Sequence, residues 1–230
     1  MAMLELLDPR RHGNLRLRAR GTDFPHFIQI VASEFPVAAT CCPILFTKEA
    51  STGAFYAGAM FGFKPGEVLV GPADEQRGFV PLMLQREGFF ISGQHISIDR
   101  EHTRFSESEG APMFDDAQQP GDALRAIQRT LGEIHQGLEQ TKAFIAALLE
   151  LKLIEPIDIS LSFDGGERLS LQGLYTVSLD RLRDLDDGAA LRLFRAGHLQ
   201  LAYTMAASLR QIARLARVRD RRSAGAGHHI

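Results

Sequence analysis

Residues 122–153 read DALRAIQRTLGEIHQGLEQTKAFIAALLELKL. Apolar side chains recur along this stretch with alternating steps of three and four residues, which places them on one face of a helix. They are Leu124, Ile127, Leu131, Ile134, Leu138, Ile145 and Leu148, and Thr141 interrupts them in the same register. Asp122 is suited to cap the start of such a helix. The stretch therefore predicts one long helix from Asp122 to about Leu153.

The apolar face of this helix could be covered in two ways. A heptad-like pattern that persists for more than three repeats can pair with a second chain, which would make the protein a homodimer or a larger homo-oligomer. Helices of globular proteins also carry apolar stripes that cover a sheet or a neighbouring helix of the same chain. We favour the covering within the chain, and we keep a homodimer through the Leu124–Leu148 helix as an alternative.

The residues before this helix have the features of β-strands. Residues 43–48, 54–63, 79–85 and 88–92 are short, aromatic or β-branched stretches separated by Gly, Pro and Asp. Gln94–Phe105 could add a half-exposed strand. Pro65 and Gly66 occupy the two central positions expected of a type II turn. The first half therefore predicts an antiparallel sheet.

Residues 106–122 differ in character from both flanks. This stretch is acidic, contains two prolines and two glycines, and shows no hydrophobic period. We interpret it as a surface connection between two possible subdomains, a β-rich one at 1–105 and a helical one at 122–222, within a single domain at 1–222. Its carboxylates are best explained as solvated, because a polar loop does not hold acid–base pairs in a cleft.

The residues after the long helix predict one β-hairpin and then helices. Ile157–Phe163 alternates between apolar and polar residues, 164–167 supply a turn, and Arg168–Leu171 return. Short helices are expected after Ser178 and after Asp186 or Asp187, with Gly197 placed to end the second. A last helix is expected over Leu199–Arg219, followed by a flexible tail at 223–230. The predicted fold class is α+β, an N-terminal antiparallel sheet followed by a mainly helical half with one hairpin.

Composition indicates an ordinary globular protein. Of the 230 residues, 45% are hydrophobic and 23% charged, and the net charge of −2 gives no reason to expect a nucleic-acid partner. The two cysteines, Cys41 and Cys42, are adjacent, which excludes a disulfide framework and fits a reducing compartment. Neither a secretory signal nor a membrane-spanning segment is recognisable in the sequence. We therefore expect a cytoplasmic protein without a transmembrane segment.

Motifs for nucleotide cofactors and nucleophilic serines are missing from the sequence. Cys41 and Cys42 lie in an apolar stretch without a neighbouring cation, so packing is their expected role. His95 and Asp99 would share one face of a strand, and a metal site would need further ligands such as His26 or His198. We expect no cofactor, and we keep a metal-assisted enzyme using His95 and Asp99 as an alternative.

The last predicted helix carries a stripe of arginines. Arg210, Arg214, Arg217 and Arg221 recur at steps of four, three and four residues and therefore share one face. Arg219 and Arg222 would broaden the stripe, and only Asp220 opposes it. Such a face can dock an acidic partner, a phosphate-bearing ligand or an anionic membrane, or it can simply be solvated. These four arginines are the candidate binding residues.

An ordered series of short motifs runs through nearly the whole chain. It comprises Glu34-Phe-Pro36, Cys42-Pro-Ile-Leu-Phe46, Gly62-Phe-Lys-Pro-Gly-Glu67, Gly78-Phe-Val-Pro81, Gly110-Ala-Pro-Met-Phe-Asp115, Leu151-Lys-Leu-Ile-Glu-Pro156 and Leu171-Gln-Gly-Leu-Tyr-Thr-Val177, followed by Leu182, Leu185, Gly197 and Tyr203. From about Glu34 to Leu209 the chain resembles the SapC family of bacterial proteins. Cys42 is a departure, because an aromatic residue is more usual before this proline.

The resemblance implies an association with surface-layer proteins and no established catalytic signature. Together with the arginine stripe and the heptad-like helix, it favours a non-catalytic component that binds a protein or peptide. Such a component would serve the modification or export of surface proteins. The two alternatives are the metal-assisted enzyme and the structural homo-oligomer.

Overall fold

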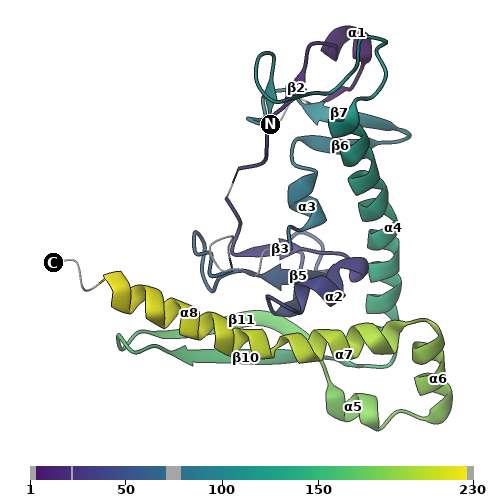
Figure 1. Cartoon of the computed structure of the whole chain (residues 1–230). Helices are drawn as coiled ribbons and strands as arrows, with labels where there is room; N and C mark the ends of the chain where they lie inside the picture. The colour runs from purple at the N-terminus through teal and green to yellow at the C-terminus, as the bar shows by residue number, and fades with distance from the viewer. Residues whose placement is uncertain (1–3, 22, 71–78, 227–230) are drawn as a thin grey trace. The chain divides into compact units, whose positions relative to one another are not determined.

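The computed structural model describes residues 4–21, 23–70 and 79–226 (Figure 1). Its contacts divide the chain into two compact units, each built from two separate stretches. Unit 1 combines Met1–Asp23 with Val80–Gln136, and unit 2 combines Phe24–Phe79 with Gly137–Ile230. The units are thus not the two consecutive segments considered from the sequence.

Unit 2 contains an antiparallel five-stranded sheet with the order β10-β11-β4-β5-β3. Its strands are β3 (Phe27–Gln29), β4 (Ile44–Lys48), β5 (Phe55–Met60), β10 (Ile154–Ser162) and β11 (Arg168–Val177). The predicted strands at 43–48 and 54–63 are confirmed, as is the hairpin, although both of its strands are longer than expected. Because Tyr175 of β11 pairs with Phe46 of β4, the sheet joins a stretch that precedes α4 to one that follows it.

The two faces of this sheet bury different side chains. Ile44 and Phe46 belong to one hydrophobic cluster, whereas Leu45 between them belongs to another. Successive side chains of a strand point to opposite faces, so this alternation requires a cover on both sides. Residues 43–46 are all apolar because the strand is buried on both faces of the sheet.

Helices of unit 2 supply these covers. They are α2 (Phe35–Ala38), which follows the 3₁₀ turn η1 (Ala32–Glu34), then α5 (Leu179–Arg183), α6 (Asp187–Arg195), α7 (His198–Ser208) and α8 (Arg210–Ala226). Asp186 caps α6, because its side chain accepts the Ala189 N–H. Gly197 follows α6 with φ of 74°, a left-handed conformation that ends the helix as predicted.

The single helix expected over Leu199–Arg219 is wrong, because the chain forms α7 and α8 with a break at Leu209. The Leu209 and Ile212 N–H groups bond three residues back, to Ala206 and Leu209, which tightens the turn. Ser208 Oγ accepts the Ile44 N–H at 2.8 Å and so ties the break to β4. In Figure 1, α7 and α8 follow one another alongside the β10–β11 hairpin. Residues 223–226 continue α8, and the rest of the expected tail lies outside the described residues.

Unit 1 contains two antiparallel three-stranded sheets, with the orders β1-β7-β6 and β8-β2-β9. Its elements are β1 (Leu4–Leu6), α1 (Pro9–His12), β2 (Arg16–Leu17), α3 (Leu82–Gln85), β6 (Phe89–Ser92), β7 (His95–Asp99), β8 (Phe105–Ser106) and β9 (Ala111–Pro112). The strand predicted at 88–92 is confirmed as β6. The strand considered over Gln94–Phe105 is shorter, because it turns after Asp99.

Two predictions in this unit are wrong. Residues 79–85 contain the short helix α3 instead of a strand, since Pro81 begins a helical turn that buries Leu82 and Leu84. The stretch 106–122 is more than a surface connection. It contributes to β8 and β9, and it buries Met113 and Phe114 in the core of unit 1.

The long helix is α4 (Asp122–Glu150), and the division between the units falls within it, after Gln136. Leu124, Ile127 and Leu131 belong to the core of unit 1. Ile145 and Leu148 belong to a core of unit 2. The heptad-like face is therefore covered within the chain, as the favoured interpretation has it. The homodimer through this helix stays a prediction.

The fold is thus a mixed α/β architecture with several antiparallel sheets. In the part of the chain that the structure describes, no helix is long and apolar enough to cross a membrane.

Candidate functional site

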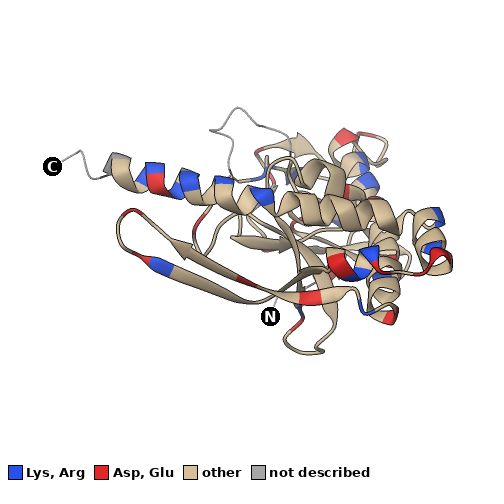
Figure 2. Cartoon of the chain, turned by 90° about the horizontal axis from the view of Figure 1, so that it is seen from below, with Lys and Arg blue, Asp and Glu red and all other residues tan. Residues whose placement is uncertain are grey.

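Helix α8 packs one face against the β10–β11 hairpin. Leu215 and Val218 are buried there, and Ile159 of β10 lies in the same cluster. The apolar positions of α8 fix which of its residues face solvent, because a helix turns by 100° per residue. Figure 2 shows the arginines of α8 as blue bands at successive turns of the helix.

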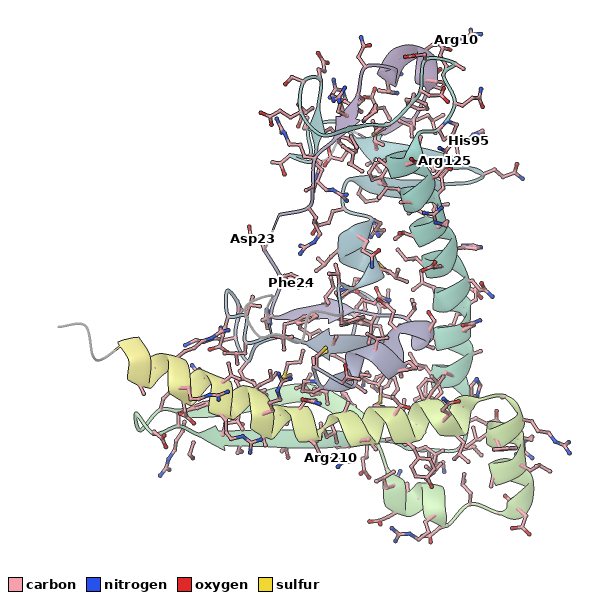
Figure 3. The ribbon with its side chains drawn as sticks, in the orientation of Figure 1. Arg10, Asp23, Phe24, His95, Arg125 and Arg210 are labelled. Carbon is pink, nitrogen blue, oxygen red and sulfur yellow. The ribbon has the colours of Figure 1, made fainter. Side chains whose placement is uncertain are left out.

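Three arginines of the predicted stripe lie on the solvent side of α8. Arg210, Arg217 and Arg221 are exposed, and their angular positions around the helix agree to within about 40°. No salt bridge joins any of them to another residue in the described ranges. Their charges are therefore left without a partner from the described parts of this chain. Arg210 is labelled at the start of the helix in Figure 3.

Arg214, the fourth member, is half-buried and has an internal contact. Its Nη1 donates to the Cys41 carbonyl at 3.4 Å. One turn earlier, Gln211 Nε2 donates to the carbonyls of Ala39 and Thr40 at 3.1 Å. These bonds hold the first half of α8 against the segment after α2. The position of the helix that carries the arginines is therefore fixed within unit 2.

Arg219 does not broaden the stripe, as the sequence suggested, because it is buried on the opposite side. Its Nε lies 2.8 Å from Glu67 Oε1, and its Nη2 lies 3.0 Å from Glu167 Oε1. Its guanidinium carbon is 4.2 Å from the centre of the Phe163 ring. Sequence reasoning missed this cluster, because Glu67 is distant in the chain and follows an ordinary turn motif.

Arg222 is exposed, but it also has a partner within the chain, since its Nη1 donates to the Val68 carbonyl. Asp220 is occupied as well, because its Oδ1 accepts the Asp164 N–H at 3.1 Å. The charged residues of α8 thus form two sets. Arg219, Asp220 and Arg222 bond to other parts of unit 2. Arg210, Arg217 and Arg221 form the outer set. We call the outer set, together with the half-buried Arg214, the arginine face.

The residues of the metal alternative lie along one strand. His95, which is labelled in Figure 3, is exposed at the start of β7. Asp99 ends the same strand. Four residues of a strand span about 13 Å, too far for both side chains to bind one ion without further rearrangement. Among the described residues, no group of three His, Cys, Asp or Glu side chains could hold a metal.

His26 and His198, considered as further ligands, both belong to unit 2, whereas His95 belongs to unit 1. The ring of His198 packs at 5.6 Å from that of Phe144. Burial lowers the pKa of His198, because desolvation disfavours the charged imidazolium. His198 is thus a half-buried histidine that packs against an aromatic ring.

The adjacent cysteines are buried and free, in agreement with the packing role. Their sulfur atoms share a hydrogen bond of 3.8 Å, which lowers the pKa of Cys41 and raises that of Cys42. The nearby charge of Arg214 acts to lower both pKa values. This cation was absent from the local sequence, and the fold brings it from α8.

Comparisons with curated proteins and with solved structures found no match. The model of the SapC family matches residues 7–215 of the 230 residues. The match extends from just before α1 into the first turns of α8 and includes all the motifs on which the resemblance rested. The chain therefore belongs to the SapC family.

Proposed function

We propose that this protein is a non-catalytic component that binds an acidic segment of a protein or peptide on the arginine face of α8. The single observation behind the proposal is the sorting of charge on this helix. Arg219 and Arg222 are used internally, whereas Arg210, Arg217 and Arg221 share a solvent-exposed side without an ion-pair partner in the described chain. A like-charged row of this kind attracts a complementary acidic surface.

The dimensions of the face suggest the length of its partner. From Arg210 to Arg221 the helix rises about 16 Å, which an extended peptide spans with about five residues. A short run of Glu or Asp could therefore meet all the arginines at once. In keeping with the family, we assign such a segment to a protein destined for surface modification or export, and we expect the encounter in the cytoplasm.

The proposal predicts a selective loss of binding when this face is reversed in charge. The probe is a fluorescein-labelled peptide with five consecutive glutamates, and binding is followed by fluorescence anisotropy. Arg210→Glu with Arg217→Glu should weaken binding at least about tenfold, because two attractive charges become repulsive. Binding by the unchanged protein should also weaken as salt screens the charges.

The matched control is Arg192→Glu with Arg195→Glu on α6, where both arginines are exposed. It changes the net charge by the same amount and should alter affinity by less than about twofold, because surface charges far from a contact contribute little. Equal losses in both double variants would indicate nonspecific attraction and would overturn the proposal. So would an unchanged protein that does not bind the probe at low salt.

A further inference from the structure

Unit 1 contains a cavity that the arginine face does not involve. Its volume is about 860 Å³, within the range of roughly 300–1,000 Å³ common for small-ligand sites. The walls come from the end of β2, from α3, from β9 and from the first turns of α4. Small side chains keep it open, namely those of Ala19, Ala111, Ala123 and Ala126.

Arg104 is the notable polar residue of this cavity. Its side chain is nine-tenths buried, and its Nη1 donates to the carbonyls of Gln85 and Glu87 at 2.7 and 3.1 Å. These two bonds orient the guanidinium through backbone groups, which carry no charge. Its Nε is buried without a hydrogen-bond partner. The charge of Glu87 favours the charged guanidinium, but no salt bridge joins Arg104 to a carboxylate among the described residues. A buried guanidinium with an unused donor and no ion pair is costly unless an anion joins it.

Two further arginines line the same cavity. Arg18 and Arg20 follow β2, and the Arg18 N–H bonds the Arg104 carbonyl at 2.8 Å. Burial is the main cause that lowers the pKa of Arg104; the charge of Glu87 acts to raise this pKa, and the charge of Arg20 acts to lower it. Arg18 is paired with Glu109 at 2.9 Å on the exposed side. Arg20, whose Nη1 donates to the Asp23 carbonyl at 2.9 Å, and Arg104 both bring positive charge to the lining of this cavity.

The remaining lining is mainly apolar. Leu17, Val80 and Ile127 contribute large apolar side chains and the four alanines contribute small ones, beside the polar side chains of Gln85 and Thr130. A small anion without an apolar part would place polar or charged groups against these apolar side chains. A ligand with an acidic head and an apolar body satisfies both halves, because the head meets the arginines and the body is removed from water.

We propose that this cavity binds the carboxylate of an amphipathic ligand, with Arg104 and Arg20 holding the head group and Ala123, Ala126 and Ile127 contacting the apolar body. The carboxylate fits the planar fork of a guanidinium. Two sources share this chemistry, a free medium-chain carboxylic acid and the C-terminus of an apolar peptide. The site is separate from the arginine face, so either proposal can fail without the other.

Calorimetric titration of the full chain with decanoate tests the head group and the body together. Decanamide, which has the same chain without the charge, should bind at least about tenfold more weakly. A peptide ending in three leucines is titrated with a free and with an amidated C-terminus. Whichever free carboxylate binds more tightly identifies the source.

Arg104→Met and Arg20→Met should each weaken decanoate binding at least about tenfold, because a charge-assisted bond is lost. Arg86→Met is the matched control, since Arg86 is also desolvated in unit 1 but does not line the cavity. Ala126→Phe should abolish binding by filling the cavity. Ala143→Phe, at an exposed position further along α4, controls for added bulk.

Should Arg104→Met fail to fold, Arg20→Met and Ala126→Phe still decide the question. Three outcomes would overturn the proposal. They are no binding of either free carboxylate at millimolar concentration, equal binding of decanoate and decanamide, and unchanged affinity in the Arg20 and Ala126 variants.

Discussion

At the scale of single residues, α4 contains two glycines with opposite surroundings. A Cβ added at Gly137 would lie 2.5 Å from Val31 Cγ2 and 2.7 Å from Val31 Cβ, whereas a Cβ at Gly132 would meet nothing within 4 Å. Helix interiors favour alanine over glycine by about 1 kcal/mol where there is room. Gly137 is therefore required by packing, and Gly132 is not.

We predict that Gly132→Ala raises the free energy of unfolding by about 0.5–1 kcal/mol. Gly137→Ala should lower it by about 1–3 kcal/mol, because the added methyl group overlaps Val31. Denaturant titration of both variants checks the pair, and each serves as the control for the other. Stabilisation by both substitutions would show that Val31 moves aside freely.

His198 predicts a dependence of stability on pH. Its pKa is lowered in the folded protein by burial, so the unfolded chain takes up the proton first as pH falls. The free energy of unfolding should therefore decrease as pH falls through the unfolded histidine pKa of about 6.5. His198→Gln should reduce the difference in denaturant midpoint between pH 7.5 and pH 5.5. The same difference in both proteins would contradict this role of the histidine.

Thr141 illustrates how much of the packing of α4 can be predicted from the sequence. It is the one polar member of the heptad-like series, and its burial follows from the pattern. Its partners do not follow, because its hydroxyl donates to the Gly137 carbonyl at 2.6 Å and accepts the Ala32 N–H at 2.8 Å. The second bond joins residues that are 109 positions apart. Periodicity predicts a face, whereas the identity of what covers it depends on distant contacts.

At the scale of elements, α8 is fastened to the hairpin by the ion pairs of Arg219. Arg219→Met should lower the free energy of unfolding by about 3 kcal/mol, because it leaves the largely buried Glu67 carboxylate without its cation. Arg217→Met is the matched control on the same helix, since Arg217 is exposed, and it should cost less than about 0.5 kcal/mol. Thermal or denaturant unfolding measures both.

Adding Glu67→Gln to Arg219→Met should restore part of the lost stability, since a neutral amide is less costly to bury than a carboxylate. A double variant that is less stable than the single one would show that Glu67 acts independently of Arg219. A double-mutant cycle, completed by Glu67→Gln alone, separates the interaction energy of the Arg219–Glu67 pair from the hydrophobic contacts of α8.

The elements also show why some predictions failed. The strand assigned to 79–85 rested on its apolar residues, but a short apolar run does not distinguish a strand from one helical turn. The helix expected over Leu199–Arg219 has a continuous helical pattern. Its break at Leu209 is tied to the bond between Ser208 and Ile44, which are 164 residues apart. Local sequence carries no signal of such a contact.

At the scale of the whole molecule, α4 contributes to the cores of both units. Leu131→Ala should weaken the core of unit 1, and Leu148→Ala that of unit 2, each by about 2–5 kcal/mol. Hydrogen exchange with mass spectrometry should then show faster exchange in β6 and β7 for the first variant, and in β4 and β5 for the second. Equal acceleration in both regions would mean that the two cores open together.

The division into units was not predictable from the sequence. Each unit combines an early stretch with a later one, and no change of composition marks Asp23, Val80 or Gln136. The candidate site was partly predictable, because the spacing of Arg210, Arg217 and Arg221 fixes their common face. The internal contacts of Arg219 and Arg222 depend on Glu67, Glu167 and Val68, which only the fold brings near.

Strand β10 has one further consequence, for the behaviour of many copies in solution. It is an edge strand of the five-stranded sheet, and an edge strand can pair with a strand of another molecule and so start aggregation. Three features oppose this. Pro156 offers no N–H, Glu155 and Asp158 carry charge, and the pairing register shifts between Ile157 and Ile159. The strand that completes the sheet thus also limits its growth, which helps the protein to stay dispersed at high concentration.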